Sequence, residues 1–545
     1  MPTIVNFNGK QVIEAGAYTK TKGGTTDGSS PTASGTVLVI DTGLGAGYGG
    51  GAGVNGESRT GLDSVYPFTN LSDFRKWVRG GIFWDLAQFL FTPSGGVDGA
   101  ERLYFIQARE SKRAGLTMTF ADGDIVLRTK AEGIGANGLQ DTETTPVAAD
   151  TNLESGFAVK FISGIVDPTK YIMQFYVGTY KGVDEENQYL SFAPSDSEPD
   201  LLVQSPEFAT ITEMATWMQA NGQFADWFDF VSSTITTTGA FTAADLTTFA
   251  NFTPFADATE TYNATDIDDV LSSIDELDYT FVLTDKQGVT NGKGVENTKL
   301  FSHLVNDAVY EKFMVVGGGV DGSQFDQLGA SSFDLAAYYN SVRAYVVHSA
   351  IKRAKIGGGF RTLSPLYHAA MVVGRLCGLE PQQPATRKII GVDEPVHKLT
   401  LKERGRALLA GVMHLKTFNG NWLINQEINT ISPNDQLIYP DGSSPEGSVM
   451  RISAALNREI KLRLEEQFVG QNAFIASPAD VKAFVEKVLK ENTAQGNTDS
   501  LIISSQNVRV SLTGTDMEVS YAFVPNSPVN RIFVTGVLLD ISSSI

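Results

Sequence analysis

One glycine pattern in the sequence has the spacing of a nucleotide-binding turn. Gly45, Gly47 and Gly50 fit G-x-G-x-x-G, and they follow an apolar run at residues 37–40 that predicts a buried strand. In a dinucleotide site this turn opens directly into a helix, whose first N–H groups bind the pyrophosphate. Here the glycine-rich stretch continues to residue 67 without a helical pattern. The pattern therefore favours a plain loop, and a nucleotide site is the alternative.

The other residues that could do chemistry do not form a catalytic or metal-binding set. No second cysteine accompanies Cys377 to hold zinc, so a small core residue is the expected role of Cys377. Gly292 and Lys293 miss the phosphate-loop spacing, which predicts a loop at residues 288–294. Five histidines show no metal-ligand spacing: His303, His348, His368, His397 and His414. We therefore predict no enzyme activity, no metal and no cofactor.

Composition narrows the class of protein. The chain has 545 residues, with 62 acidic and 42 basic side chains, for a net charge of −20. A general nucleic-acid binder needs a basic surface, so this class is not expected. No segment approaches the roughly 18 consecutive apolar residues of a membrane helix, and the first residues lack the features of a signal peptide. These features predict a soluble globular protein of several domains, made inside the cell.

The acidity is concentrated in one segment. Residues 141–280, called the acidic segment below, contain 24 acidic and three basic residues, which leaves the rest of the chain with 38 acids and 39 bases. In residues 340–420 the sign reverses, with 13 basic and four acidic residues, and Arg387, Lys388 and Arg404 are among the basic ones. Such asymmetry indicates separate domains. A solvated acidic face is one interpretation; acidic and basic faces that meet between copies of the protein are the other.

Apolar runs alternate between strand and helix patterns, which predicts an α/β, multidomain fold with additional α+β character. Strands are expected at residues 37–40, 103–106, 279–283, 314–316 and 344–347, and a helix at 82–91. The predicted division is a short N-terminal stretch with a linker at 1–35, an α/β domain at 36–140 plus 276–345, a β-rich acidic insertion at 141–275, a further domain at 346–528, and a terminal strand at 529–545.

The last third of the chain has the clearest local signals. Thr400 and Glu403 form a capping-box pattern that begins a helix expected to carry Leu408, Leu409 and Val412 on one side. Asn419 and Gly420 predict the turn of a hairpin. Amphipathic helices are expected at residues 451–468 and from 477 onward, and strands at 508–512, 518–523 and 531–539.

Short segments in a fixed order carry a resemblance to a known family. They are residues 65–74 (VYPFTNLSDF), 99–104 (GAERLY), 132–138, 364–376 (SPLYHAAMVVGRL), 391, 399–400, 411–412, 429–430 and 529–534 (VNRIFV). Together they resemble the tail sheath proteins of contractile bacteriophages, which are similar to the sheaths of pyocins and contractile injection systems. The resemblance covers about residues 10–138 and 278–541. It departs at residues 15–18 (AGAY), where sheaths often have Pro-Gly-Val-Tyr.

This resemblance implies a function and a set of partners. It implies a structural subunit that forms stacked sixfold rings around a tail tube and contracts to drive the tube through the host envelope. The implied partners are other copies of the chain, the tail tube protein, and the baseplate and tail terminator proteins, with no nucleic acid and no membrane insertion. The implied place is the virion tail, assembled in the host cytoplasm. A sheath of a non-phage injection system and a nucleotide-binding enzyme remain the alternatives.

The resemblance also suggests which residues link copies of the chain. In sheaths, an N-terminal arm and a C-terminal strand of neighbouring copies complete one another's sheet, and residues 23–35 and 525–528 would act as hinges. The expected arm residues are Gln11, Val12, Ile13, Arg531, Ile532, Phe533, Val534 and Leu538. The resemblance makes residues 346–528 the conserved inner domain, which lies near the tube in sheaths, and it makes residues 36–140 plus 276–345 and the surface insertion the outer domains. We therefore expect Arg451, Arg458 and Lys461 on the helix at 451–468 to face the tube. An ordinary core helix with a solvated face is the alternative.

Overall fold

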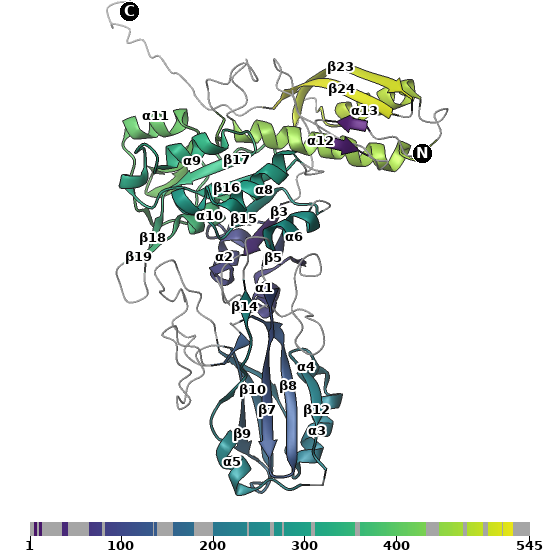
Figure 1. Cartoon of the computed structure of the whole chain (residues 1–545). Coiled ribbons are helices and arrows are strands. Elements are labelled where there is room, and N and C mark those ends of the chain that lie inside the picture. The colour runs from purple at the N-terminus through teal and green to yellow at the C-terminus, as the bar shows by residue number, and fades with distance from the viewer. Residues whose placement is uncertain are drawn as a thin grey trace, which may run out of the picture.

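The protein has three structural parts (Figure 1). A three-layer α/β domain lies in the middle, a β-rich domain extends from its lower end, and a helical unit with a long hairpin lies beside its upper part, to the right in this view. The computed structural model describes residues 5–7, 10–12, 35–41, 65–78, 82–108, 110–133, 136–138, 156–178, 200–236, 239–261, 266–274, 277–306, 311–354, 360–431, 446–471, 477–493, 500–514 and 516–526. The observed mixed α/β architecture with several sheets agrees with the predicted fold class.

An eight-stranded sheet forms the middle domain. Its inner strands are parallel, and the outermost strand at each edge is antiparallel to its neighbour. In order across the sheet the strands are β22 (Asn421–Ile424), β21 (Val412–Phe418), β17 (Ala344–His348), β16 (Phe313–Gly317), β15 (Phe281–Thr284), β3 (Thr36–Asp41), β5 (Arg102–Gln107) and β4 (Tyr66–Phe68). The central strands are fully buried, which is expected of parallel strands covered on both faces.

Helices cover both faces of this sheet. On one face pack α1 (Leu71–Trp77), α2 (Ile82–Phe91) and α10 (Pro365–Cys377). On the other face pack α6 (Asp266–Ser273), α8 (Val295–Asn306), α9 (Ser332–Tyr339) and α11 (Leu401–Leu409). The short elements α7 (Gly288–Asn291), β18 (Ile351–Ala354), β19 (Phe360–Leu363) and β20 (Glu394–Pro395) complete the domain. No helix in the described ranges is both long enough and apolar enough to cross a membrane.

The β-rich domain, called the distal domain below, comprises the described residues between 110 and 261. One sheet contains β7 (Arg113–Phe120), β8 (Gly123–Glu132) and β12 (Phe228–Ser233); the other contains β9 (Gly156–Ser163), β10 (Tyr171–Gly178), β11 (Asp200–Gln204) and β13 (Thr253–Pro254). Helices α3 (Ile211–Ala220), α4 (Gly222–Ala225) and α5 (Ala243–Phe249) accompany them, and β6 (Glu110–Ser111) pairs with β14 (Glu260–Thr261) at the junction. Aromatic rings dominate the core, as in the stack of Phe228 on Phe255.

The boundaries of this domain differ from those expected from charge. The insertion was predicted at residues 141–275, but β7 and β8 belong to it, because Leu116, Met118 and Leu127 pack into its core. These two strands carry no acidic excess, so a boundary drawn from charge misses them. At the other end, α6 packs against the middle sheet instead of the distal domain. The predicted boundary between residues 345 and 346 falls inside β17, so one sheet crosses it.

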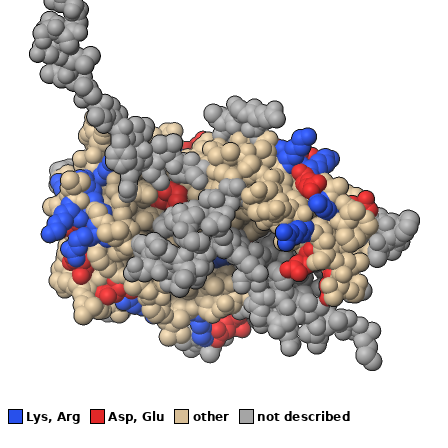
Figure 2. All heavy atoms as spheres, turned by 90° about the horizontal axis from the view of Figure 1, so that it is seen from above, with Lys and Arg blue, Asp and Glu red and all other residues tan. Residues whose placement is uncertain are grey.

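The remaining part, called the C-terminal unit below, contains α12 (Gly447–Phe468), α13 (Pro478–Glu491), β23 (Ile502–Thr513) and β24 (Asp516–Pro525). The predicted amphipathic stripe packs as expected, since Leu456 and Ile460 of α12 lie buried against Val485 of α13 and the hairpin. Figure 2 views this end from above and shows Lys and Arg gathered at opposite margins of the face. Near the N-terminus, β1 (Val5–Phe7) pairs with β2 (Lys10–Val12) in a small hairpin.

Most local signals in the last third are confirmed. Thr400 caps α11 in a capping box with Glu403. Asn419 and Gly420 both have positive φ angles, of 49° and 80°, which a two-residue hairpin turn requires. Two local predictions are wrong. Val412 begins β21 instead of ending the helix, and residues 288–294 begin with α7 instead of forming only a loop.

Buried histidines predict a loss of stability in acid. Burial lowers the pKa of both His368 and His414 to about 4. Each histidine also has a hydrogen bond to a backbone carbonyl, of Ser349 and Val412 respectively, which raises its pKa by less than burial lowers it. The unfolded chain, with histidine pKa values near 6.5, then binds more protons than the folded chain. We expect the free energy of unfolding to fall as the pH drops from about 6.5 to 4, by up to ~3 kcal/mol per histidine.

Urea unfolding at several pH values checks this expectation. The variant His368→Gln should reduce the slope of the free energy of unfolding against pH over the same window. An equally steep slope in that variant would assign the acid sensitivity to other groups.

Candidate assembly surface of the C-terminal unit

The β23–β24 hairpin is a two-stranded sheet with open edges. The two strands pair antiparallel, with Ser511 opposite Glu518, and in the described part of the chain neither strand has a second strand as neighbour. A single parallel bridge joins Ile502, at the start of β23, to Thr493. Open strand edges present unpaired N–H and C=O groups and can accept an additional strand.

The inner face of the hairpin covers the two helices only in part. Val508 is buried against them, whereas Val519, Tyr521 and Phe523 are partly exposed. Ile503 and Leu512 are 61% and 40% exposed. A group of exposed and half-covered apolar side chains is typical of a surface that contacts another molecule.

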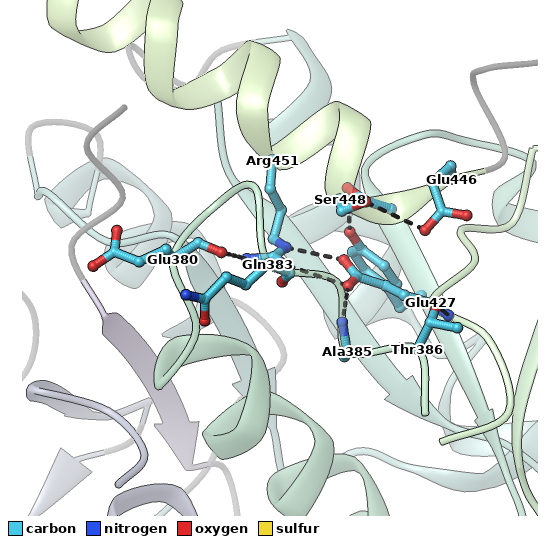
Figure 3. A network of polar contacts seen from close by, with 10 residues as sticks. Glu380, Gln383, Ala385, Thr386, Glu427, Glu446, Ser448 and Arg451 are labelled. Carbon is cyan, nitrogen blue, oxygen red and sulfur yellow. Dashed lines mark hydrogen bonds and ion pairs between the residues drawn. The ribbon is translucent and has the colours of Figure 1, made fainter. Parts of the chain in front are cut away.

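A buried ion pair joins α12 to the middle domain (Figure 3). Arg451 Nε donates to Glu427 Oε1 at 2.9 Å, and Nη2 donates to Oε2 at 3.2 Å. The Arg451 guanidinium also donates to the Glu380 and Gln383 carbonyls, at 3.3 and 2.7 Å. Glu427 in turn accepts the Ala385 N–H at 2.6 Å. This network therefore satisfies both charges inside the protein.

Electrostatics favour the charged form of Arg451 in this pair. The side chains of Arg451 and Glu427 are 1% and 0% exposed. Burial alone would lower the pKa of Arg451, but the Glu427 carboxylate beside it raises that pKa above its ordinary value. The stability of the fold depends on this pairing, because a buried charge without a partner lowers the free energy of unfolding by several kcal/mol.

A second polar connection runs from the hairpin through α12 to the sheet. The Tyr521 hydroxyl donates to Asn457 Oδ1, and Asn457 Nδ2 donates to Glu311 Oε1 at 3.1 Å. Arg343 Nη2 binds the same Glu311 oxygen at 3.2 Å. Glu311 and Arg343 lie just before β16 and β17, so the hairpin is tied to the amino ends of two parallel strands. Force applied to the hairpin would be passed to the sheet through these contacts.

The three residues expected to face a tube lie inside the packing of the chain. Arg451 pairs with Glu427, Arg458 binds Asp278, and Lys461 binds Glu465 at 3.0 Å with a side chain that is 4% exposed. The expected exposed polar side of the helix is not found along the first half of α12, because this half is enclosed by the sheet, α13 and the hairpin. Contact of these residues with a tube stays a prediction.

The expected arm residues lie mostly outside the described residues. Gln11 and Val12 belong to β2, which pairs with β1 of the same chain, with Gln11 opposite Asn6. Ile13 lies outside the described residues, as do Arg531, Ile532, Phe533, Val534 and Leu538. Their pairing with neighbouring copies therefore stays a prediction.

Two of the described residues with nucleophilic side chains, Cys377 and Ser332, are buried. Cys377 is buried, and burial raises the pKa of its thiol. Ser332 Oγ lies 2.8 Å from His348 Nδ1, but both side chains are in the core and the serine also accepts the Gly319 N–H. Within the described ranges no three His, Cys, Asp or Glu residues are placed to hold a metal ion. Gly45, Gly47 and Gly50 lie outside the described residues.

Comparisons with known proteins show what this chain is similar to. It is 24% identical over 272 residues to the tail sheath protein of Bacillus phage SP01, a match that covers 47% of this chain and 42% of that protein. It is 23% identical over 263 residues to the tail sheath protein of Staphylococcus phage Twort, again over 42% of that protein. The chain thus spans less than half the length of these curated relatives. No family model matches the chain.

A solved structure has the same fold. The crystal structure of the sheath tail protein from Desulfitobacterium hafniense superposes with a TM-score of 0.54 and 13% sequence identity, over 94% of this chain and all of that one. The predicted resemblance to tail sheath proteins is therefore confirmed.

Proposed function

We propose that this chain, which is similar to tail sheath proteins, is the structural subunit of a contractile tail sheath. Copies polymerise as stacked sixfold rings around a tail tube, and contraction of the polymer drives the tube through the host envelope. The partners are other copies of the chain, the tail tube protein, and the baseplate and terminator proteins. The protein belongs to the virion tail, is assembled in the host cytoplasm, and needs no cofactor and no catalytic site.

The hairpin is the observation that carries this proposal. β23 and β24 have only each other as strand neighbours in the described part of the chain, and their inner face is incompletely covered. A strand from another copy can add to an open edge through main-chain hydrogen bonds, which hold regardless of most side chains. Two open edges allow two added strands, one for each arm.

The two predicted arms supply strands for these edges. The segment with Gln11, Val12 and Ile13 would add to one edge, and the segment with Arg531 to Leu538 would add to the other. Strand links of this kind tolerate large rotations of the linked bodies when flexible residues flank them. Residues 23–35 and 525–528 have the glycine-, serine- and proline-rich composition of such linkers.

The anchored helix α12 supports the mechanical part of the proposal. The Arg451–Glu427 pair ties α12 to the middle domain. The hydrogen bonds from Tyr521 to Asn457 and from Asn457 to Glu311 tie the hairpin to it as well, so that the hairpin, α12 and the middle domain would move as one body. Contraction would then change the angles between copies while each hairpin keeps its added strands.

Negative-stain electron microscopy of the purified protein tests this proposal. We expect striated tubes with sixfold end views, formed by the protein alone or on added tail tubes. Closed icosahedral shells, narrow unstriated tubes, or a protein that stays monomeric with and without tail tubes would contradict a sheath.

A further inference from the structure

Four of the five histidines of the chain lie together at the carboxyl end of β17. His348 is the last residue of this strand, and His414 lies opposite it on the parallel neighbour β21. His368 Nδ1 of α10 donates to the carbonyl oxygen of Ser349, the next residue, at 2.8 Å. His397, in the segment before α11, lies 3.0 Å from His348. The strand links of the proposed function involve none of these side chains.

The contact between His348 and His397 joins two ring nitrogens. His348 Nε2 lies 3.0 Å from His397 Nδ1, and His348 Nδ1 lies 2.8 Å from Ser332 Oγ on α9. The Phe325 ring packs against both imidazoles, with centroids 5.0 and 5.3 Å away. His348 is only 2% exposed, and these two contacts engage both of its ring nitrogens. The His348 ring is therefore held on both sides.

A hydrogen bond between two imidazoles exists only in certain charge states. One nitrogen must carry a proton, and the other must offer a lone pair. If at least one ring is neutral, the contact is kept, because the other ring can donate to it. If both rings are charged, two N–H groups and two positive charges face each other at 3.0 Å. The contact is then repulsive.

Two carboxylates lie near His397. Glu403 Oε1 of α11 is 4.0 Å from His397 Nε2. Hydrogen bonds from Ser323 lower the pKa of Asp321, and the nearby His397 lowers it further. A proton on His397 thus has a favourable partner on each side of the ring, with Glu403 facing Nε2 and the lone pair of a neutral His348 facing Nδ1.

The surroundings of His348 oppose a proton there at the same time. Burial lowers the pKa of His348 well below its ordinary value, and His397, His368 and His414 lower it further. Basic side chains of α11 and β21 add positive charge beside His414: Arg404 and Lys416. Both rings of the pair can be charged together only if they move apart.

The contact fastens the start of α11 to the sheet. His397 N donates to Ser349 Oγ at 3.3 Å, and His397 comes three residues before Thr400, which caps α11. Ala407 alone among the nine residues of α11 is buried. Because the helix buries so little of its own surface, its position depends strongly on the contacts at its start.

We propose that the His348–His397 contact is an acid-operated latch, which holds α11 on the middle sheet while at least one ring is neutral and releases it when both rings carry a proton. Release frees α11 and the segment before it, residues 396–409, while the sheet stays folded. The latch does not depend on assembly of copies, so it goes beyond the proposed function and is tested on the monomer.

The proton balance gives the direction and size of the effect. With α11 released, both imidazoles meet water, and each regains a pKa near 6.5. The released form then binds about one proton more than the latched form in acid. Its population should therefore rise by up to about tenfold for each pH unit below about 6.5. Between about pH 7 and about pH 5 we expect the equilibrium constant for release to rise at least about tenfold.

Hydrogen exchange with mass spectrometry measures release. Protection factors, which relate each amide to an unstructured peptide at the same pH, remove the direct effect of pH on exchange. We expect α11 to be less protected than α2, and its protection to fall at least about tenfold between about pH 7 and about pH 5. Low urea should lower the protection of α2 more than that of α11, because local release exposes little surface.

Two results of this measurement would overturn the latch. One is a protection of α11 that does not change with pH. The other is a protection of α11 that matches that of α2 in size and in urea dependence, since α11 would then open only when the whole domain unfolds.

Substitutions assign the pH dependence to the pair. In His397→Gln the amide oxygen can accept the N–H of a charged His348, so α11 should lose most of its pH dependence. His348→Gln should have the same effect, because only one titrating ring remains. His303→Gln changes the fifth histidine, which lies in α8, and is the matched control with the wild-type pH dependence. The slope against pH is compared, so a variant that is less stable at every pH still gives an answer. A wild-type slope in both His348→Gln and His397→Gln, or an equal loss of slope in His303→Gln, would contradict the latch.

Discussion

Deletion of residues 529–545 should leave a folded monomer that forms no sheaths. The described residues of the middle domain, distal domain and C-terminal unit form buried clusters of their own, so we expect these parts to fold without the deleted segment. The deleted segment contains Arg531, Ile532, Phe533, Val534 and Leu538, which we propose add to an open edge of a neighbour's hairpin. Without that strand, main-chain links between copies are lost.

Analytical ultracentrifugation and negative-stain microscopy measure this effect, and thermal unfolding establishes that the variant is folded. Deletion of only residues 540–545 is the matched control, since it keeps the predicted strand at 531–539. Normal sheaths from the longer deletion would contradict the role of the C-terminal arm. Loss of sheaths with both deletions would show that the terminal residues matter for a reason other than the predicted strand.

Replacement of Arg451 by Met should lower the free energy of unfolding by about 3–5 kcal/mol, because it leaves the Glu427 carboxylate buried without its counter-ion. The same change removes the donors to the Glu380 and Gln383 carbonyls. Urea unfolding measures the loss, and hydrogen exchange along α12 locates it. The double variant Arg451→Met/Glu427→Gln should lose less than the sum of the two single variants, since the stranded charge is then absent.

Arg463→Met is the matched control on the same helix. Arg463 pairs with Glu459 and Glu491 with a side chain that is 40% exposed, so its loss should cost within about 1 kcal/mol. Equal costs for Arg451→Met and Arg463→Met would contradict the importance of the buried pair. Because Arg451 holds α12 in place, its replacement cannot test contact with a tube separately from folding.

The sequence predicted the positions of many helices, strands and turns of this protein to within a few residues. The helix predicted at residues 82–91 is α2, and the strand predicted at 37–40 is the centre of β3. Capping at Thr400 and the turn at Asn419 and Gly420 were also correct. These signals depend on interactions between residues a few positions apart, and such interactions can be read from spacing.

The domain boundaries were predicted less accurately from the sequence than the helices and strands were, for a physical reason. Net charge marks a segment, but core packing decides which strands belong together. β7 and β8 are joined to the distal domain by apolar contacts with β12, more than 90 residues later in the chain. In the same way β17 joins a sheet whose neighbouring strands come from both sides of the predicted boundary.

The sequence by itself determined the α/β class, most helices and strands, the absence of a recognisable catalytic motif, the uneven charge and the resemblance to tail sheath proteins. Only the tertiary structure decided which charges are available for contact. Arg451, Arg458 and Lys461 seemed exposed from helical periodicity, yet α12 is enclosed on several sides and pairs them within the chain. Arg387, Lys388, Lys402, Arg404 and Lys416 stay unpaired among the described residues. Lys461 has its partner one turn later on the same helix, but Glu427 and Asp278, the partners of Arg451 and Arg458, come from distant parts of the chain that only folding brings near.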